Sequence, residues 1–97
     1  MNNASTLSFV LRARNRLKVL NSLLSGQRFS GQIEEQTGMY KSHVSRTLKE
    51  LTQMKLITCS NPKDRSYKFY KITPTGKELA LQANKLLISK RKDSVKK

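Results

Sequence analysis

The sequence predicts a mainly α-helical domain that carries one small β-hairpin, and three observations lead to this fold class. Apolar residues recur at spacings of three and four along most of the chain, which is the period of an amphipathic helix. The pattern changes to alternation at 57–60 and 68–72, on either side of a polar, turn-rich loop at 61–66. The strongest helix start follows directly at Thr73-Pro74, because Pro74 suits a first helical position that Thr73 can cap.

The composition fits one soluble domain with a polyanionic partner. The chain has 97 residues, enough for a single domain over 1–97, and its 20 Lys and Arg against 6 Asp and Glu give a net charge of +14. This charge favours a polyanion, because each cation near a phosphate releases a condensed counterion; a merely basic soluble domain is the alternative. The single cysteine, Cys59, rules out an intrachain disulfide. With no signal peptide and no apolar run of membrane-spanning length, we expect a cytoplasmic protein.

The first helix is expected at 7–25, after a polar segment at 1–6 that we expect to be frayed. Ser25-Gly26 ends this helix, with Gly26 as a left-handed cap. One face carries an apolar stripe made of Val10, Ala13, Leu17, Leu20 and Leu24.

Two further helices are expected within 30–54. Ser30 is a good N-cap for the first of them, which ends before Thr37-Gly38. The second runs from Lys41 to Met54, and Val44, Leu48 and Leu51 form its apolar stripe. Two helices joined by a few residues around a glycine are typical of a helix-turn-helix motif, whose second helix lies in the major groove of DNA.

The remaining elements complete a winged helix-turn-helix. The segment 56–72 forms a two-stranded wing with a basic tip, 74–90 forms a C-terminal helix, and 91–97 is a basic tail that we expect to be disordered. The predicted fold therefore has a three-helix core, a two-stranded wing and a C-terminal helix.

Three segments of the chain are similar to segments of a known family. The stretch 37–51 resembles a turn and recognition helix, Leu56-Ile57 resembles the pair that opens the wing, and 71–76 resembles the entry to the helix after the wing. On these segments the chain, over about 17–79, resembles winged-helix transcriptional regulators of the MarR and ArsR type, including small archaeal and viral members. Three positions depart from the family pattern: Lys55 replaces a usual Gly, Glu34 a small residue, and Tyr40 a small N-cap.

The resemblance implies that polar residues of the third helix bind double-stranded DNA. Arg46 is the expected base contact, since a guanidinium can bond bidentately to guanine, and Lys41 and Lys49 are expected at phosphates. In the wing, Arg65 is expected in the minor groove, oriented by Asp64. The alternatives are solvated surface residues, and an ordinary turn in which Asp64 bonds its own backbone. The full predicted set is Tyr40, Lys41, Ser42, His43, Ser45, Arg46, Lys49, Lys63, Arg65 and Lys68.

Other kinds of site are not indicated. No nucleophile-base set, carboxylate pair or Gly-rich phosphate loop is present, so we expect neither an enzyme nor a cofactor. His43 and Cys59 lie in different elements and do not suggest a metal site. Cys59 is interpreted as an apolar filler on the inner face of the wing, with a redox role as the alternative. The aromatic residues expected to fill the core or back the hairpin are Phe9, Phe29, Tyr67, Phe69 and Tyr70.

Surplus apolar surface predicts a homodimer. In the last helix, the stripe expected against the core consists of Leu79, Ala83 and Leu86. Two further apolar pairs lie on other sides of this helix: Ala80 with Leu87, and Leu81 with Ile88. A monomer whose last helix packs over its first is the alternative. The residues expected at the dimer interface are Leu7, Phe9, Leu11, Leu81, Leu87 and Ile88.

Three functions follow from these features. A sequence-specific regulator is favoured. A nucleoid-type architectural protein is the first alternative, because of the high charge and the lysine-rich tail. A winged-helix protein-interaction module is the second, which the basic third helix disfavours.

Overall fold

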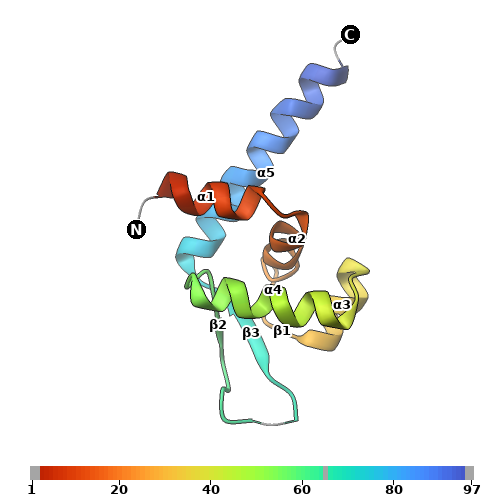
Figure 1. Ribbon diagram of the computed structural model, residues 1–97, viewed down its shortest axis with the longest axis vertical. Helices are drawn as coiled ribbons and strands as arrows, with labels where there is room; N and C mark the ends of the chain where they lie inside the picture. The colour runs from red at the N-terminus through yellow and green to blue at the C-terminus, as the bar shows by residue number, and fades with distance from the viewer. Residues whose placement is uncertain (1–2, 65, 96–97) are drawn as a thin grey trace.

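The computed structural model describes residues 3–64 and 66–95, with side chains over 4–64 and 66–88. Within these ranges it contains five helices and one three-stranded sheet, a mainly α fold with a small wing (Figure 1). The predicted fold class is therefore confirmed. In chain order the elements are α1 (Asn3–Leu11), α2 (Arg14–Ser22), β1 (Arg28–Phe29), α3 (Ser30–Thr37), α4 (Lys41–Gln53), β2 (Ile57–Cys59), β3 (Phe69–Ile72) and α5 (Pro74–Val95).

The single helix predicted at 7–25 is two helices, and the prediction was wrong in this respect. The chain bends between α1 and α2, where Ala13 has an extended backbone with φ −133° and ψ 119°. The segment expected to fray is helical from Asn3, and Thr6 is only 3% exposed. The bend lets α1 lie across α5 (Figure 1). Since Val10 and Leu17 are buried on either side of it, the apolar period gives no sign of the break.

The end of α2 also differs from the prediction. The helix ends at Ser22, and Leu23 is its C-cap with right-handed helical angles. Gly26, expected to cap the helix, lies in the following loop with φ +147°. The loop is fastened by Arg28, whose Nε donates to the carbonyl oxygen of Ser22 at 2.7 Å.

The helix-turn-helix lies where it was predicted. Ser30 is the first residue of α3 and not its cap; the backbone N–H of the preceding Phe29 donates to Oε1 of Gln32 at 3.0 Å. Gly38 ends α3 in the left-handed conformation, φ 74°, which a residue with a Cβ rarely adopts. Helix α4 begins three residues later, with Tyr40 at the cap position.

The predicted hairpin is present, and a third strand joins it. Strands β2 and β3 pair antiparallel, with Ile57 opposite Ile72. Strand β1 pairs with the other edge of β3, so the sheet order is β1-β3-β2. Two residues directly before a helix are too short to show alternation, and β1 was therefore not predicted.

Helix α5 starts as predicted and continues further, to Val95 and not to residue 90. Its backbone thus includes most of the segment expected as a disordered tail, in which lysine and arginine are good helix formers. Thr73 caps the helix, since its Oγ1 accepts the N–H of Gly76 at 3.1 Å and donates to the carbonyl of Leu56 at 3.0 Å. In the described part of the chain, no helix is both long and apolar enough to cross a membrane.

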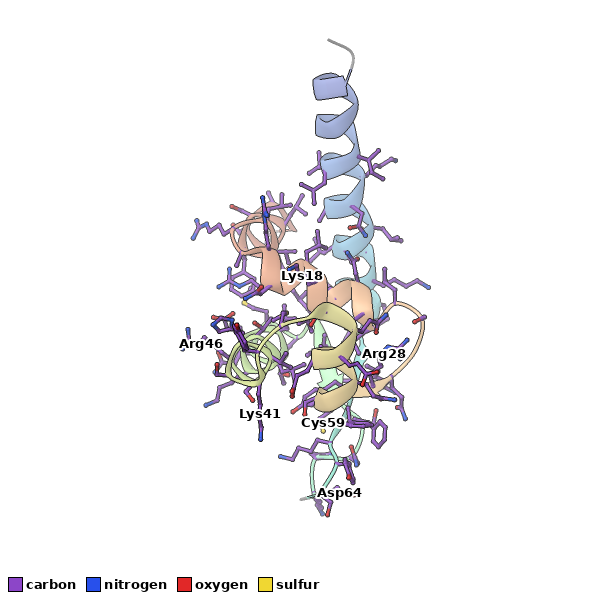
Figure 2. All side chains as sticks on the ribbon, turned by 90° about the vertical axis from the view of Figure 1, so that its right-hand side faces the viewer. Lys18, Arg28, Lys41, Arg46, Cys59 and Asp64 are labelled. Carbon is purple, nitrogen blue, oxygen red and sulfur yellow. The ribbon has the colours of Figure 1, made fainter. Side chains whose placement is uncertain are left out.

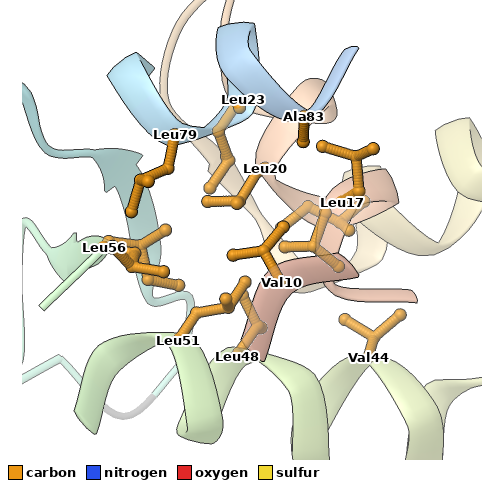
Figure 3. Packing of buried hydrophobic residues seen from close by; sticks show 14 of the residues in the cluster. Val10, Leu17, Leu20, Leu23, Val44, Leu48, Leu51, Leu56, Leu79 and Ala83 are labelled. Carbon is orange, nitrogen blue, oxygen red and sulfur yellow. The ribbon is translucent and has the colours of Figure 1, made fainter. Parts of the chain in front are cut away.

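One apolar core joins α1, α2, α3, α4, the start of β2 and the first turns of α5, and Figure 3 shows part of it. On α5, Leu79 and Ala83 are buried as predicted. Leu86, expected on the same stripe, is 48% exposed, whereas Ala80, expected on another side, is fully buried. The reason is that α1 covers a second side of α5 near its start, and the later turns extend beyond the domain (Figure 1). The other buried apolar residues include Val10, Leu17, Leu20, Leu23, Val44, Leu48, Leu51 and Leu56.

Candidate nucleic-acid interface

The polar face of α4 is open to solvent. Val44, Leu48 and Leu51 are buried and fix the rotation of the helix, so that its other sides face outward. Figure 2 shows Lys41 and Arg46 on one side of the molecule and Arg28 on the other. All the residues of this helix that we predicted to bind DNA are exposed: Lys41, Ser42, His43, Ser45, Arg46 and Lys49.

A groove of about 810 Å³ separates α4 from the wing. It brings together three cations from two elements, Arg46 and Lys49 of α4 and Lys68 of the wing. None of the described residues that line it is acidic, so the groove has a positive potential suited to an anion. Its complete lining is Ser30, Ser45, Arg46, Leu48, Lys49, Thr52, Gln53, Cys59, Pro62, Ser66, Lys68 and Tyr70.

Several hydroxyl and amide groups in this groove were not predicted as site residues. Thr52 and Gln53 follow Lys49 by three and four residues on the same helix, so helical spacing alone could have identified them. Ser30 and Tyr70 reach the groove only through tertiary packing. Burial, and secondarily the nearby thiol of Cys59, raise the pKa of the Tyr70 phenol above its usual value of 10.0. At neutral pH the phenol is protonated, as it would be at its usual pKa, and can donate a hydrogen bond.

The start of α4 presents an aromatic pair and an uncapped backbone. Tyr40 is 77% exposed, and its ring stands edge-on to that of His43, with 5.9 Å between the ring centroids. The Tyr40 side chain makes no capping hydrogen bond, which is the consequence of its replacing a small cap residue. The first N–H groups of α4 thus carry the partial positive charge that favours a phosphate.

The wing loop is closed by hydrogen bonds from two side chains. The carboxylate of Asp64 accepts the N–H of Tyr67 at 3.2 Å and that of Ser66 at 2.8 Å, which lowers the pKa of Asp64 below its ordinary 3.8. This is the ordinary turn that we gave as the alternative for Asp64. Asn61 donates to the carbonyl of Tyr67 and accepts the N–H of Phe69, both at 2.7 Å. Lys63 is exposed in this loop, and Arg65 lies outside the described residues.

Aromatic side chains hold the wing against the start of α3, as expected of residues that back the hairpin. The ring of Phe29 makes edge contacts with Tyr67 and Phe69, with centroid separations of 5.2 and 5.7 Å. Phe9, in contrast, lies in α1, where the guanidinium of Arg16 stands 3.7 Å from its ring centroid. These contacts therefore fasten the wing to the residue that directly precedes α3.

Cys59, which we interpreted as an apolar filler on the inner face of the wing, is half-buried and lines the groove between the wing and α4. Its Sγ lies 3.9 Å from Oδ1 of Asn61. Over residues 3–64 and 66–95, no three His, Cys, Asp or Glu side chains gather into a group that could hold a metal ion.

The predicted dimer residues divide into two groups. On α5, Leu81, Leu87 and Ile88 are 54%, 44% and 57% exposed, and Leu86 joins them. On α1, Leu11 is 39% exposed, but Leu7 and Phe9 already pack against the core of their own chain. The surplus apolar surface thus lies mainly on α5.

Solved structures with the same fold include transcriptional regulators from several organisms. BldR, a transcriptional regulator from Sulfolobus solfataricus, superimposes with a TM-score of 0.78 at 19% identity over 87% of this chain. A MarR/EmrR family transcriptional regulator from Acinetobacter sp. ADP1 gives 0.68 at 25% identity over 84%. The homodimeric winged helix-turn-helix DNA-binding domain of Mb0332 from Mycobacterium bovis gives 0.67 at 21% identity over 94% of this chain and 81% of its own length. The chain spans only 61% of BldR and 59% of the Acinetobacter protein.

These likenesses define the class of fold, a winged helix-turn-helix like that of MarR- and ArsR-type regulators. Residues 14–58, from the start of α2 into β2, match the family model described as bacterial regulatory protein, arsR family. The predicted resemblance is confirmed by this match. The comparison with curated proteins gave no match.

Proposed function

We propose that this protein is a sequence-specific regulator of transcription that binds double-stranded DNA as a homodimer and catalyses no reaction. The observation that supports this function most directly is the cationic groove between α4 and the wing. The match of residues 14–58 to the arsR family and the regulators among the structural neighbours agree with it. A DNA-binding role requires a compartment that holds DNA, so we propose a cytoplasmic location.

The dimensions of DNA suit this arrangement. A major groove is about 12 Å wide and admits one α-helix. With α4 in the major groove and the wing over the adjacent minor groove, the intervening sugar-phosphate strand runs through the groove between them. Lys49 and Lys68 then face its phosphates from both sides, and the Ser45 hydroxyl supplies a shorter contact. Arg46, which is exposed on the same face of α4, reaches a base edge.

The exposed apolar side chains of α5 supply the dimer contact. Leu81, Leu86, Leu87 and Ile88 lie on a helix that extends beyond the domain (Figure 1), where no other described part of the chain covers them. Pairing two such helices around a two-fold axis buries both surfaces and presents two copies of α4 to an inverted repeat. The homodimeric Mb0332 domain supports this proposal.

The decisive experiment selects bound sequences from a random DNA pool and then measures affinity for the selected site. Arg46→Ala is expected to weaken binding by about 1–3 kcal/mol and to relax preference at one base position, whereas Lys49→Ala weakens binding to all sequences alike. Lys18→Ala is the matched control, because it removes one exposed charge from α2, outside the groove. If the Arg46 and Lys49 variants bind like the control, the groove is not the DNA site.

An architectural role is the second candidate, and the net charge of +14 favours it. Exposed cations such as Lys55, Lys71 and Lys77 do not line the groove and add attraction for any polyanion. The same selection distinguishes the two functions. An architectural protein enriches no common sequence and loses affinity steeply with salt on every DNA, while a regulator enriches one site.

A further inference from the structure

Arg16 makes three contacts that join three helices. Its Nη1 donates to the carbonyl oxygen of Phe9 at 2.6 Å, and its guanidinium stands 3.7 Å from the centroid of the Phe9 ring. Its Nε lies 3.2 Å from Oε1 of Glu50, in an ion pair. The Arg16 side chain is only 17% exposed, and that of Glu50 34%. One side chain of α2 therefore holds the end of α1 and the side of the recognition helix α4.

The contact with α1 follows from the bend between α1 and α2. In a continuous helix the carbonyl of Phe9 would accept the N–H of Ala13, but Ala13 is extended and begins the next element. Arg16 satisfies this carbonyl and places a positive charge at the C-terminus of α1. Only a planar guanidinium can stack on a ring and donate in two directions at once; a lysine ammonium cannot do both.

A second polar contact joins α2 to α5. The side-chain amides of Asn21 and Asn84 donate to one another, at 3.1 and 2.8 Å. Helices α1 and α5 pack together, and α5 carries the surface proposed for the dimer. Through Asn21 and Arg16, helix α2 thus connects the dimer helix α5 to α1 and α4.

We infer that Arg16 is a positioning residue that sets the orientation of α4 relative to α1 and α5, and thereby the half-site spacing that the dimer accepts. This inference rests on the proposed function. A change of one base pair between half-sites rotates one of them by about 34° and moves it by roughly 3.4 Å. A dimer tolerates that change only if its two recognition helices can reorient.

Arg16 acts on orientation and not on formation of the fold. The core that packs α4 against α1 and α2 includes Val10, Leu17, Leu48 and Leu51, which are apolar and do not depend on the ion pair. A variant that loses the contacts of Arg16 should keep its core and its polar α4 surface while α4 gains freedom to tilt.

The test compares DNA spacing profiles of the full chain. The inverted repeat selected by the wild type is synthesised with its spacer unchanged, one base pair longer and one shorter, together with a single half-site. Affinities for wild type, Arg16→Lys and Glu50→Gln are measured by fluorescence anisotropy at one salt concentration. Arg14→Lys is the matched control, because Arg14 is exposed on the same helix. Circular dichroism and sedimentation establish that each variant is folded and dimeric.

Wild type and Arg14→Lys are expected to lose about tenfold in affinity when the spacer changes, and Arg16→Lys about threefold or less. All of them should bind the single half-site equally. A wild-type spacing profile for folded Arg16→Lys overturns the inference. If that variant does not fold, Glu50→Gln decides in its place, since it weakens only the contact with α4. Failure of the wild type to select any DNA refutes the proposed function itself, whereas selection without a spacing preference refutes only the role of Arg16.

Discussion

Replacing Gly76 by alanine should strongly destabilise the protein, although local propensity predicts the opposite. Gly76 lies in the first turn of α5, where alanine is favoured over glycine by about 1 kcal/mol. An added Cβ would overlap the carbonyl oxygen of Leu56 and lie 2.9 Å from its carbonyl carbon. The obstacle is backbone that cannot rotate aside, and the Cγ1 of Ile72 at 3.0 Å closes another direction.

The magnitude follows from what must move. Overpacking of this kind costs about 1–3 kcal/mol or more. The Leu56 carbonyl also accepts the N–H and the hydroxyl of Thr73, both at 3.0 Å, and each weakened hydrogen bond adds about 0.5–1.5 kcal/mol. After the gain in helix propensity is subtracted, we expect Gly76→Ala to lower the free energy of unfolding by about 2–4 kcal/mol. This is a large part of the roughly 5–15 kcal/mol by which a small domain is typically stable.

Urea and thermal unfolding, followed by circular dichroism at one protein concentration, measure this loss. For a domain of this size the expected fall in Tm is about 10–25 °C. Lys77→Ala is the matched control in the same turn; Lys77 is exposed, and its substitution should change the stability by about 0.5 kcal/mol or less. If Gly76→Ala is as stable as the control, the close approach of α5 to Leu56 does not exist in solution.

Three further predictions concern other parts of the chain. Lys55 has φ 61°, so Lys55→Gly should raise the free energy of unfolding by about 0.5–1 kcal/mol in urea titrations; a decrease would mean that this conformation is not adopted. Leu81→Glu combined with Ile88→Glu should convert a dimer into a folded monomer in sedimentation equilibrium, since both side chains are exposed on α5, and a dimer that survives both charges is not built on this face. In an NMR titration the pKa of the Asp64 carboxyl should lie below its ordinary value of 3.8, because the N–H groups of Tyr67 and Ser66 stabilise the charged form. The contribution of this carboxylate to stability is present above about pH 4 and is lost as the pH falls through the lowered pKa of the folded state. Asp64→Asn should remove that pH dependence.

Local patterns were sufficient for the elements that carry the proposed function. The stripe of Val44, Leu48 and Leu51 determines both that α4 is a helix and which of its residues face outward, because a buried apolar face leaves the others exposed. The left-handed Gly38 and the Thr73 cap were also predictable, because each depends on the chemistry of only one or two neighbouring residues.

Only tertiary packing decided the rest. The bend at Ala13 keeps the apolar period intact and lets α1 lie across α5, and β1 pairs with the edge of β3; the local sequence pattern indicates neither contact. The cationic groove brings Lys49 near Lys68, which lies on a different element. The contacts of Arg16 join Phe9 to Glu50, two residues that are far apart in the sequence. The sequence by itself determined α3, α4, the turn between them, the start of α5 and the polar recognition surface, because these depend on residues a few positions apart. Which surfaces meet, and which side of α5 stays exposed, depends on distant segments that come together only when the core closes.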